Sequence, residues 1–300
     1  MSYAKLFSQK FPSSTIGEDF DVAQAIYDAY SDGRIKPLTI HVRGTGERTP
    51  RTYIGASRIG QECERRVWLE FRGLAEEDFE GRMLRLFSRG DIGEERMRHE
   101  LRCIGFEAAG DQSAMSGFGG RFGGHTDGFV RLPGAPWLLL ECKTASSKSF
   151  RRYLKVGLEK WKSTYWSQIH TYMGAFALAQ CLYMVVNKDT DQISIQLFDY
   201  DESVAKKAYA RARRVVTGDL PTRPFGAPKK PTCLWCPASQ FCWEDQPLAK
   251  KCGSCRHWSS VDKNGGACGR DGRRVTQHDV CADYEVLEQP DEDAVFVWGD

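Results

Sequence analysis

The chain has 300 residues, of which 41% are hydrophobic and 12% aromatic, and its formal net charge is +2. This length and composition predict a globular protein with one large core and a small appendage. They exclude the class of chains that are too short or too polar to bury a hydrophobic core. Residues 1–14 lack the apolar segment of a secretory signal, and polar residues interrupt the uncharged stretch 163–187. We therefore expect a soluble, cytoplasmic protein with no membrane partner.

The charges are unevenly distributed along the chain. Residues 275–300 contain eight acids and no lysine or arginine, which leaves +10 on the rest of the chain. The sequence thus predicts a basic body with an acidic tail. Eleven cysteines in a reducing compartment indicate metal or cluster ligation rather than disulfides.

The first predicted elements are helices. Helical spacing covers residues 19–30 and ends at Asp32-Gly33, and the segment up to residue 51 is interpreted as a connecting arm. A second helix is predicted from Ser57 to about Gly73, and a third from about Asp91 to Ile104.

An apolar run, residues 137–140, continues without a break into Glu141-Cys142-Lys143. The turn at residues 132–136 predicts a hairpin centred on Gly134, which lies seven residues from both Asp127 and Glu141. The two carboxylates should therefore lie opposite each other. Strand alternation places Glu141 and Lys143 on one face and Cys142 on the other.

The remaining pattern is α/β, a central mixed sheet flanked by helices. Helices are predicted at about 158–179 and 202–216, strands near 182–186 and 193–198, and a proline-rich linker at 221–231. The domain prediction assigns four segments: an N-terminal helix and arm (1–52), a main domain (53–248), a small C-terminal metal-binding module (249–284) and an acidic tail (285–300).

The hairpin residues have the chemistry of a hydrolytic metal site. Asp127 and Glu141 can hold Mg²⁺ or Mn²⁺, and the carbonyl of Cys142 can add a third oxygen. Lys143 can orient a water molecule or offset charge on a phosphate. Such a set suits phosphodiester hydrolysis, although a Glu/Lys pair on a strand is commonly a surface feature.

At this point the sequence resembles the PD-(D/E)xK nuclease superfamily, with its restriction-endonuclease-like fold. Gly90-Asp91-Ile92-Gly93-Glu94 is similar to the first helical motif of RecB-like members, which assigns a metal-facing role to Glu94, with Glu95 as its rival. His99 is interpreted as a helix-surface residue. Gln168 and Tyr172 match the family's Q-x-x-x-Y element, and share one helix face at i and i+4.

The cysteines form two sets. Cys233, Cys236 and Cys242 are a compact three-ligand group, and in AddB-like and CRISPR-associated relatives an upstream cysteine completes a 4Fe-4S cluster. The resemblance assigns that role to Cys63, and zinc in the same four thiolates is the alternative. Cys103 and Cys181 are interpreted as core thiols.

The second set has C-x2-C-x12-C-x12-C spacing, which is typical of zinc ribbons. It consists of Cys252, Cys255, Cys268 and Cys281, and either His257 or His278 could replace one of them. The family resemblance does not extend to this module, and we expect the segment from Lys250 onward to be separable from a folded core.

The resemblance as a whole implies a Mg²⁺- or Mn²⁺-dependent DNA exonuclease that processes single-stranded or duplex ends, in a bacterial or phage recombination or CRISPR context, with a possible recombination or annealing partner protein. Trp161, Tyr165 and Trp166 could stack on bases or could simply pack in the core. The alternatives are a structure- or sequence-specific endonuclease on the same fold and a non-catalytic DNA-binding subunit.

Overall fold

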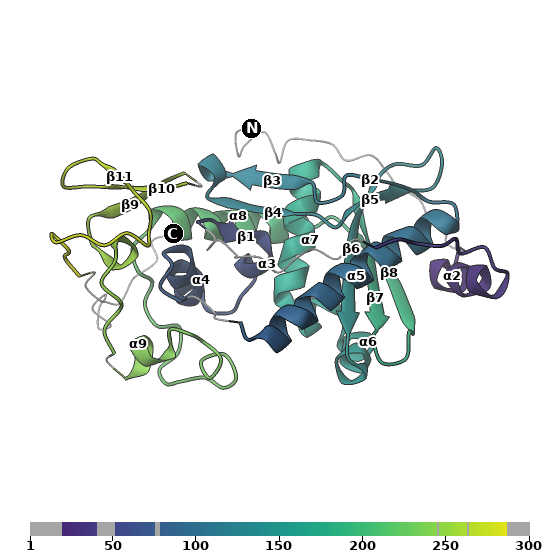
Figure 1. The fold of residues 1–300 in the computed structure, drawn as a ribbon, viewed down its shortest axis with the longest axis horizontal. Helices are drawn as coiled ribbons and strands as arrows, with labels where there is room; N and C mark the ends of the chain where they lie inside the picture. Colours follow the sequence, from purple (N-terminus) through teal and green to yellow (C-terminus); the bar gives the residue numbers. More distant parts are fainter. Residues whose placement is uncertain (1–19, 41–51, 76–78, 245, 263, 287–300) are drawn as a thin grey trace. The chain divides into compact units, whose positions relative to one another are not determined.

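The computed structural model describes residues 20–40, 52–75, 79–244, 246–262 and 264–286. The chain forms two compact units (Figure 1). Unit 1 comprises residues 1–48, 79–115 and 124–206, and unit 2 comprises residues 49–78, 116–123 and 207–300. The chain passes between the units several times, so their boundaries differ from the four consecutive segments of the domain prediction.

Unit 1 contains a five-stranded mixed sheet. Its strand order is β2-β5-β6-β7-β8, and every neighbouring pair is antiparallel except β6 and β7, which are parallel. The strands are β2 (Glu107–Ala109), β5 (Gly128–Arg131), β6 (Leu138–Ala145), β7 (Gln180–Asn187) and β8 (Ile193–Asp199).

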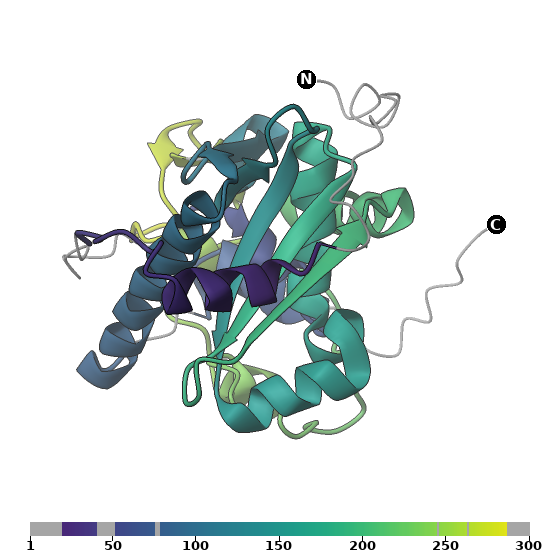
Figure 2. The ribbon, with the colours of Figure 1, turned by 90° about the vertical axis from the view of Figure 1, so that its right-hand side faces the viewer.

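Helices pack on both faces of this sheet: α2 (Val22–Ser31), α5 (Gly81–Cys103), α6 (Ser147–Trp161) and α7 (Ser163–Phe176). Figure 2 shows α2 and α5 crossing one face, where Ile26 and Leu101 share an apolar core with Cys142 and Met184. On the other face Tyr153 of α6 packs on a tyrosine of β7. The predicted α/β class, a central mixed sheet flanked by helices, is confirmed.

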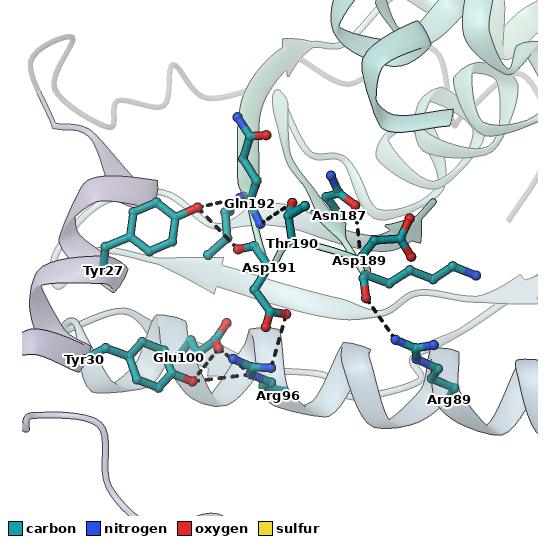
Figure 3. A network of polar contacts seen from close by, with 12 residues as sticks. Tyr27, Tyr30, Arg89, Arg96, Glu100, Asn187, Asp189, Thr190, Asp191 and Gln192 are labelled. Carbon is teal, nitrogen blue, oxygen red and sulfur yellow. Dashed lines mark hydrogen bonds and ion pairs between the residues drawn. The ribbon is translucent and has the colours of Figure 1, made fainter. Parts of the chain in front are cut away.

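A polar network attaches α2 and α5 to the turn between β7 and β8 (Figure 3). Glu100 accepts hydrogen bonds from Tyr30 Oη at 2.8 Å and from Arg96 Nε at 2.9 Å. Arg96 also lies 3.6 Å from Asp191, and the Tyr27 hydroxyl accepts from a backbone N–H of β8 at 2.6 Å. The network holds α5, and hence the residues of its middle turns, in a fixed position on the sheet.

Two predicted helices are wrong in extent because backbone breaks divide them. The segment 57–73 forms α3 (Ala56–Ile59) and α4 (Glu64–Phe71), since Gly60 ends the first helix and Cys63 caps the second through its sulfur. The segment 158–179 is divided between α6 and α7 by the extended Lys162, with φ −150° and ψ 89°. The third predicted helix, α5, begins ten residues earlier than expected.

The sequence did not predict a three-stranded sheet, most of whose residues belong to unit 2. It has the order β1-β4-β3, with β1 (Ile54–Gly55) parallel to β4 (Phe122–His125), and β3 spans Ala114–Gly117. The glycine-rich segment 117–124 carries a short 3-10 turn and leads into β4. Unit 2 also holds α9 (Ser239–Trp243) and the part of α8 (Glu202–Thr217) from Lys207 onward.

The C-terminal module is an antiparallel ribbon within unit 2, with the order β11-β10-β9. Its strands are β9 (Trp258–Asp262), β10 (Gly265–Cys268) and β11 (Arg274–Val275). The predicted acidic tail lies almost entirely outside the described residues, as do residues 41–51 of the predicted arm.

Arg72, at the end of α4, fixes the module to the rest of unit 2. Its side chain is buried and donates to the carbonyls of Gly253 at 2.6 Å and Cys255 at 2.9 Å. The guanidinium lies 4.6 Å from the ring centroids of both Trp68 and Trp258. Deleting the module would leave a buried charge without these acceptors and should therefore cost stability, and the separability of the module stays a prediction.

Within the described part of the chain, no helix has both the length and the apolar character needed to cross a membrane.

Candidate active site

The hairpin of β5 and β6 has the register that the sequence predicted. Gly128 pairs with Leu140, so the next position along the ladder brings Asp127 opposite Glu141. The connecting turn contains Gly134 with φ 80°, a conformation that glycine adopts without strain. Leu138, Leu140 and Cys142 enter the core on the α5 face, and Glu141 and Lys143 lie on the α7 face.

Three charged groups of this hairpin converge. Glu141 is fully buried, and its Oε1 contacts the ammonium of Lys143. The same ammonium lies 3.7 Å from Oδ2 of Asp127, which also accepts a 2.8 Å hydrogen bond from the backbone N–H of Cys142. The second oxygen of Glu141, Oε2, is buried and has no hydrogen-bond partner among the described residues. An unsatisfied buried carboxylate oxygen is available to a ligand.

Glu94 approaches the hairpin from α5. Gly93, directly before it, lies so close to β6 that a Cβ there would be 2.9 Å from the Thr144 side chain. Oε1 of Glu94 accepts from Gln112 at 3.1 Å and from Arg98 at 3.3 Å. The charges of Asp127 and Lys143 both act on Glu94, so this carboxyl group lies within electrostatic range of the hairpin.

Glu94 and Glu95 share one partner on α5. Arg98 lies 3.3 Å from Glu94 and 2.8 Å from Glu95, and Glu95 is about twice as exposed as Glu94. The ring of His99 contacts the backbone carbonyl of Lys36 at 2.8 Å, in keeping with its interpretation as a helix-surface residue. The greater burial of Glu94 favours it over Glu95 as the α5 carboxylate of the site, and the assignment stays a prediction.

The site carries more negative than positive charge in buried surroundings. Burial, followed by the charge of Asp127, raises the pKa of Glu141 to about 8 and that of Glu94 to about 7. Burial disfavours the charge of Lys143, but Glu141 and Asp127 outweigh it and raise the pKa of the lysine well above its usual value. Lys143 faces the two hairpin carboxylates and Arg98 pairs with Glu94, so three carboxyl groups and two cations meet here. The carboxyl oxygens are a donor set for a divalent cation.

The Gln168–Tyr172 pair lies beside this group on α7. Both side chains are buried and hydrogen-bonded to each other, and burial followed by the charge of Glu141 raises the pKa of Tyr172. The Tyr172 hydroxyl occupies space that only a glycine leaves open, since a Cβ on Gly124 would be 2.3 Å from it. The i and i+4 spacing thus lets Gln168 bond to Tyr172, and Tyr172 lies near enough to Glu141 to be affected by its charge.

Of the three aromatic residues proposed for base stacking, two pack in the fold. Trp161 is 8% exposed and donates to Ser149 Oγ at 3.1 Å, and Trp166 packs on His170 at 4.1 Å. Tyr165 differs, because the Lys143 ammonium lies 5.1 Å from its ring centroid. The contact of Tyr165 with Lys143 was not predicted from the sequence, and neither were the contacts of Gln112 and Arg98 with Glu94. Of these residues, only Arg98 has a signal in the sequence, which is its i+4 spacing from Glu94.

The first cysteine set comes together within unit 2. Cys63, Cys233, Cys236 and Cys242 all line one pocket. Two nitrogen donors point at the sulfurs: the Arg65 side chain lies 3.4 Å from Cys242 Sγ, and the Arg66 backbone N–H lies 3.3 Å from Cys63 Sγ. Burial and the neighbouring thiols Cys242 and Cys233 raise the pKa of Cys63. All the cysteines of the chain are free thiols.

Across the residues that the structure describes, no three His, Cys, Asp or Glu side chains stand in the arrangement of a bound metal ion. Lys143 balances part of the carboxylate charge in this arrangement. The unpartnered Oε2 of Glu141 and the excess of carboxyl groups fit a divalent cation at Glu94, Asp127 and Glu141. The four thiols with their N–H donors fit a thiolate-bound metal or cluster.

No protein-family model and no curated protein sequence matches this chain. Among solved structures it is similar to an alkaline exonuclease from Laribacter hongkongensis, both alone and in complex with dAMP, with 16% identity, a TM-score of 0.41, and coverage of 55% of this chain and 87% of that chain. It is also similar to SSO0001, with 16% identity, a TM-score of 0.39, and coverage of 74% of this chain and 93% of that chain. Similarities this distant concern the path of the chain, and the site geometry carries the functional argument.

The close approach of α5 to β6 predicts opposite effects for two glycines of the same helix. Gly90 has open space where a Cβ would be, so Gly90→Ala should stabilise the helix by about 0.5–1 kcal/mol. Gly93→Ala gains the same helix propensity but must displace Thr144, and should destabilise the protein by about 1–3 kcal/mol. Urea unfolding of both variants measures the difference. Equal stabilisation by the two substitutions would contradict the described position of α5.

Proposed function

We propose that this protein is a metal-dependent DNA nuclease that hydrolyses phosphodiester bonds. The observation that carries the proposal is the convergence of Asp127, Glu141 and Lys143 in one buried place of unit 1. The partly buried Glu94 of α5 is near enough for its charge to act on Glu141. The hairpin register and the position of α5 bring these groups together from segments up to about fifty residues apart. A non-catalytic binding subunit has no need of such a costly group of buried charges.

In this proposal Glu94, Asp127 and Glu141 hold Mg²⁺ or Mn²⁺. The cation supplies an activated water molecule and offsets the negative charge that grows on the phosphate during hydrolysis. The Cys142 backbone N–H orients the Asp127 carboxylate through their 2.8 Å hydrogen bond. Buried carboxylates that are already placed need little rearrangement when the substrate arrives.

Lys143 is the cationic group of the site. Its ammonium is within reach of both hairpin carboxylates, and the Tyr165 ring limits its position from the other side. We propose that it orients the attacking water or contacts the scissile phosphate. Gln168 and Tyr172 act as positioning residues, because their mutual hydrogen bond fixes the tyrosine ring beside Glu141.

The helix that follows β6 offers a surface for the DNA backbone. Phe150, Tyr153 and Trp161 of α6 are buried, and the helix is interrupted at Gly157, with φ 76° and ψ 169°. Five exposed cations of this segment have no ion-pair partner among the described residues: Lys148, Arg151, Arg152 and Lys155 before the break, and Lys160 after it. Unpaired cations close in sequence to the catalytic strand are suited to phosphate contacts that do not depend on base sequence.

The activity proposed is that of an exonuclease acting on DNA ends, in recombination or a related process. Substituting the hairpin residues tests the chemistry. Asp127→Asn, Glu141→Gln and Lys143→Met should each reduce cleavage of end-labelled linear DNA by about 100-fold or more, because the charges that bind the cation and stabilise the transition state are lost. DNA binding without metal should change little.

Two matched controls accompany these variants. Glu94→Gln should impair cleavage while Glu95→Gln, one residue along α5, should leave most of it. Closed circular DNA run in parallel separates the modes of cleavage, since an exonuclease leaves it intact and an endonuclease opens it. Full activity of Glu141→Gln would overturn the proposed site, and cleaved circles would replace the exonuclease with an endonuclease on the same residues.

A second experiment addresses the basic face of α6. Arg151→Glu should weaken binding to a DNA oligonucleotide by about tenfold at low salt. It should also reduce the slope of log affinity against log salt concentration by about one, as expected for the loss of one phosphate contact. The matched control is Arg34→Glu, an exposed arginine after α2, on the other face of the sheet. Fluorescence anisotropy over a salt series gives both quantities. Identical behaviour of the two variants would exclude α6 as the DNA-binding surface.

We further propose that Cys63, Cys233, Cys236 and Cys242 hold a 4Fe-4S cluster. Its role is structural, because hydrolysis of a phosphodiester transfers no electrons. The arrangement supports this role, since it joins the start of α4 to the segment around α9 across about 170 residues of sequence. The N–H groups of Arg65 and Arg66 that point at two of the sulfurs suit thiolate ligands.

Metal and sulfide analysis of anaerobically purified protein tests the cluster. The protein should be brown and contain about four iron and four sulfide per chain, and Cys63→Ser or Cys236→Ser should lose most of both. Cys103→Ser, on α5 in unit 1, serves as the control and should retain the cluster. Colourless protein with zinc at these cysteines would replace the cluster by a zinc site and leave the nuclease proposal standing.

A further inference from the structure

We infer that the C-terminal ribbon of unit 2 contains a structural zinc site formed by Cys252, Cys255, Cys268 and Cys281. The inference is independent of the proposed nuclease activity, because it concerns a different unit of the chain and residues that take no part in the hairpin site. Its support comes from the backbone path of the ribbon, the surroundings of the four thiols and the size of the local core.

The first two thiols lie on one tight turn. Residues 252–254 form a 3-10 turn, and the N–H of Cys255 donates to the carbonyl of Cys252 at 3.0 Å. The Ser254 hydroxyl donates to the carbonyl of Ala249 at 2.5 Å and stabilises this turn from within. A C-x2-C turn of this kind is how a short segment supplies two ligands to one ion.

Backbone pairing brings the other two cysteines to the same turn. Cys268 of β10 pairs with Trp258 of β9, whose N–H donates to the Cys255 carbonyl at 3.2 Å. The N–H of Cys252 donates to the carbonyl of Asp279 at 2.7 Å, two residues before Cys281. Four residues that are spread over thirty positions of sequence thus lie around one turn.

The backbone path supplies four thiols around the ligand turn, one pair from the turn itself, one from β10 and one from the segment after Asp279. In this structure their side chains do not stand in the closed arrangement of a bound metal ion. Together they offer a set of four soft sulfur ligands, which select zinc or iron over hard cations.

The ribbon has too small a core to fold without further support. Among the described residues 246–262 and 264–286, the buried hydrophobic side chains are Cys252, Cys255 and Trp258, and two of these three are the thiols themselves. Segments of this size usually gain their stability from a metal or from disulfides, and these cysteines are free. Zinc fits best, because it is redox-inert and tetrahedral with four thiolates.

The neighbouring histidines are not needed as ligands. The His257 ring lies 3.1 Å from the Glu285 carboxylate, which fixes it on that side of the ribbon. The backbone N–H of His278 donates to Thr276 Oγ1 at 3.3 Å. Four cysteines are enough to fill a tetrahedral zinc site, so we assign all four positions to cysteine.

The site also explains how the ribbon is joined to α4. The carbonyls of Gly253 and Cys255, on the ligand turn, are the acceptors for Arg72. A Cβ on Gly253 would be 2.0 Å from the Arg72 carbonyl, so this contact requires a glycine. Zinc that fixes the turn thereby also fixes the partners of a buried arginine, and metal loss should disturb α4 as well as the ribbon.

The test is zinc analysis of the full-length protein and its variants. Wild type should hold about one zinc per chain beyond any metal at the Cys63 group, and Cys268→Ser or Cys281→Ser should lose it and lower the thermal midpoint. Cys103→Ser, His257→Gln and Asp127→Asn should retain it. Retention by Asp127→Asn, which lacks the proposed catalytic carboxylate, separates this inference from the nuclease proposal.

X-ray absorption at the zinc edge of the wild-type protein covers the case in which the cysteine variants do not fold. Four sulfur neighbours at about 2.3 Å are expected, and a nitrogen neighbour would refute the all-cysteine assignment. Zinc content unchanged in Cys268→Ser, or protein without zinc, would overturn the inference. Loss of zinc in His278→Gln but not in Cys281→Ser would overturn the assignment of Cys281 as the fourth ligand.

Discussion

The structure of unit 1 depends on one unfavourable arrangement, the burial of Glu141 beside Asp127 and Lys143 at the centre of a sheet. Isolated charges in such a place cost several kcal/mol each, so the surrounding elements must hold compensating groups in position. The ammonium of Lys143, the Cys142 N–H and the donors to Glu94 do this in part. The Oε2 atom of Glu141 has no hydrogen-bond partner among the described residues, so part of the buried negative charge is not compensated. A divalent cation would supply the missing positive charge.

The helices on the sheet serve this arrangement. The polar network around Glu100 and Arg96 fixes α5, and Gly93 lets it approach β6 closely enough for Glu94 to reach the hairpin. On the other face, Gly124 leaves room for the Tyr172 hydroxyl beside Glu141. Gly93 thus lets α5 approach β6, and Gly124 leaves room for Tyr172, because a Cβ at either position would collide with a neighbouring side chain.

Two groups of cysteines and the buried Arg72 connect the segments of unit 2, which contains no large sheet among its described residues. Two groups of four cysteines lie at either end of α4, one at its cap residue Cys63 and one at the turn that receives Arg72. If both bind metals as proposed, α4 is held at each end by a metal site. This would explain why a segment with short strands and few buried apolar residues in its ribbon keeps a defined fold.

The sequence by itself determined the features set by local spacing. Seven-residue symmetry about Gly134 predicted the facing of Asp127 and Glu141, strand alternation predicted the opposite side for Cys142, and the α/β pattern predicted the fold class. Only the tertiary structure decided that Gly60 and Lys162 break two helices, that Glu94 is more buried than Glu95, and that Arg72 ties the ribbon to α4. The reason is physical: periodicity reports which face of an element is buried, whereas a hydrogen bond or close approach between distant segments depends on how the elements pack, which no local pattern encodes.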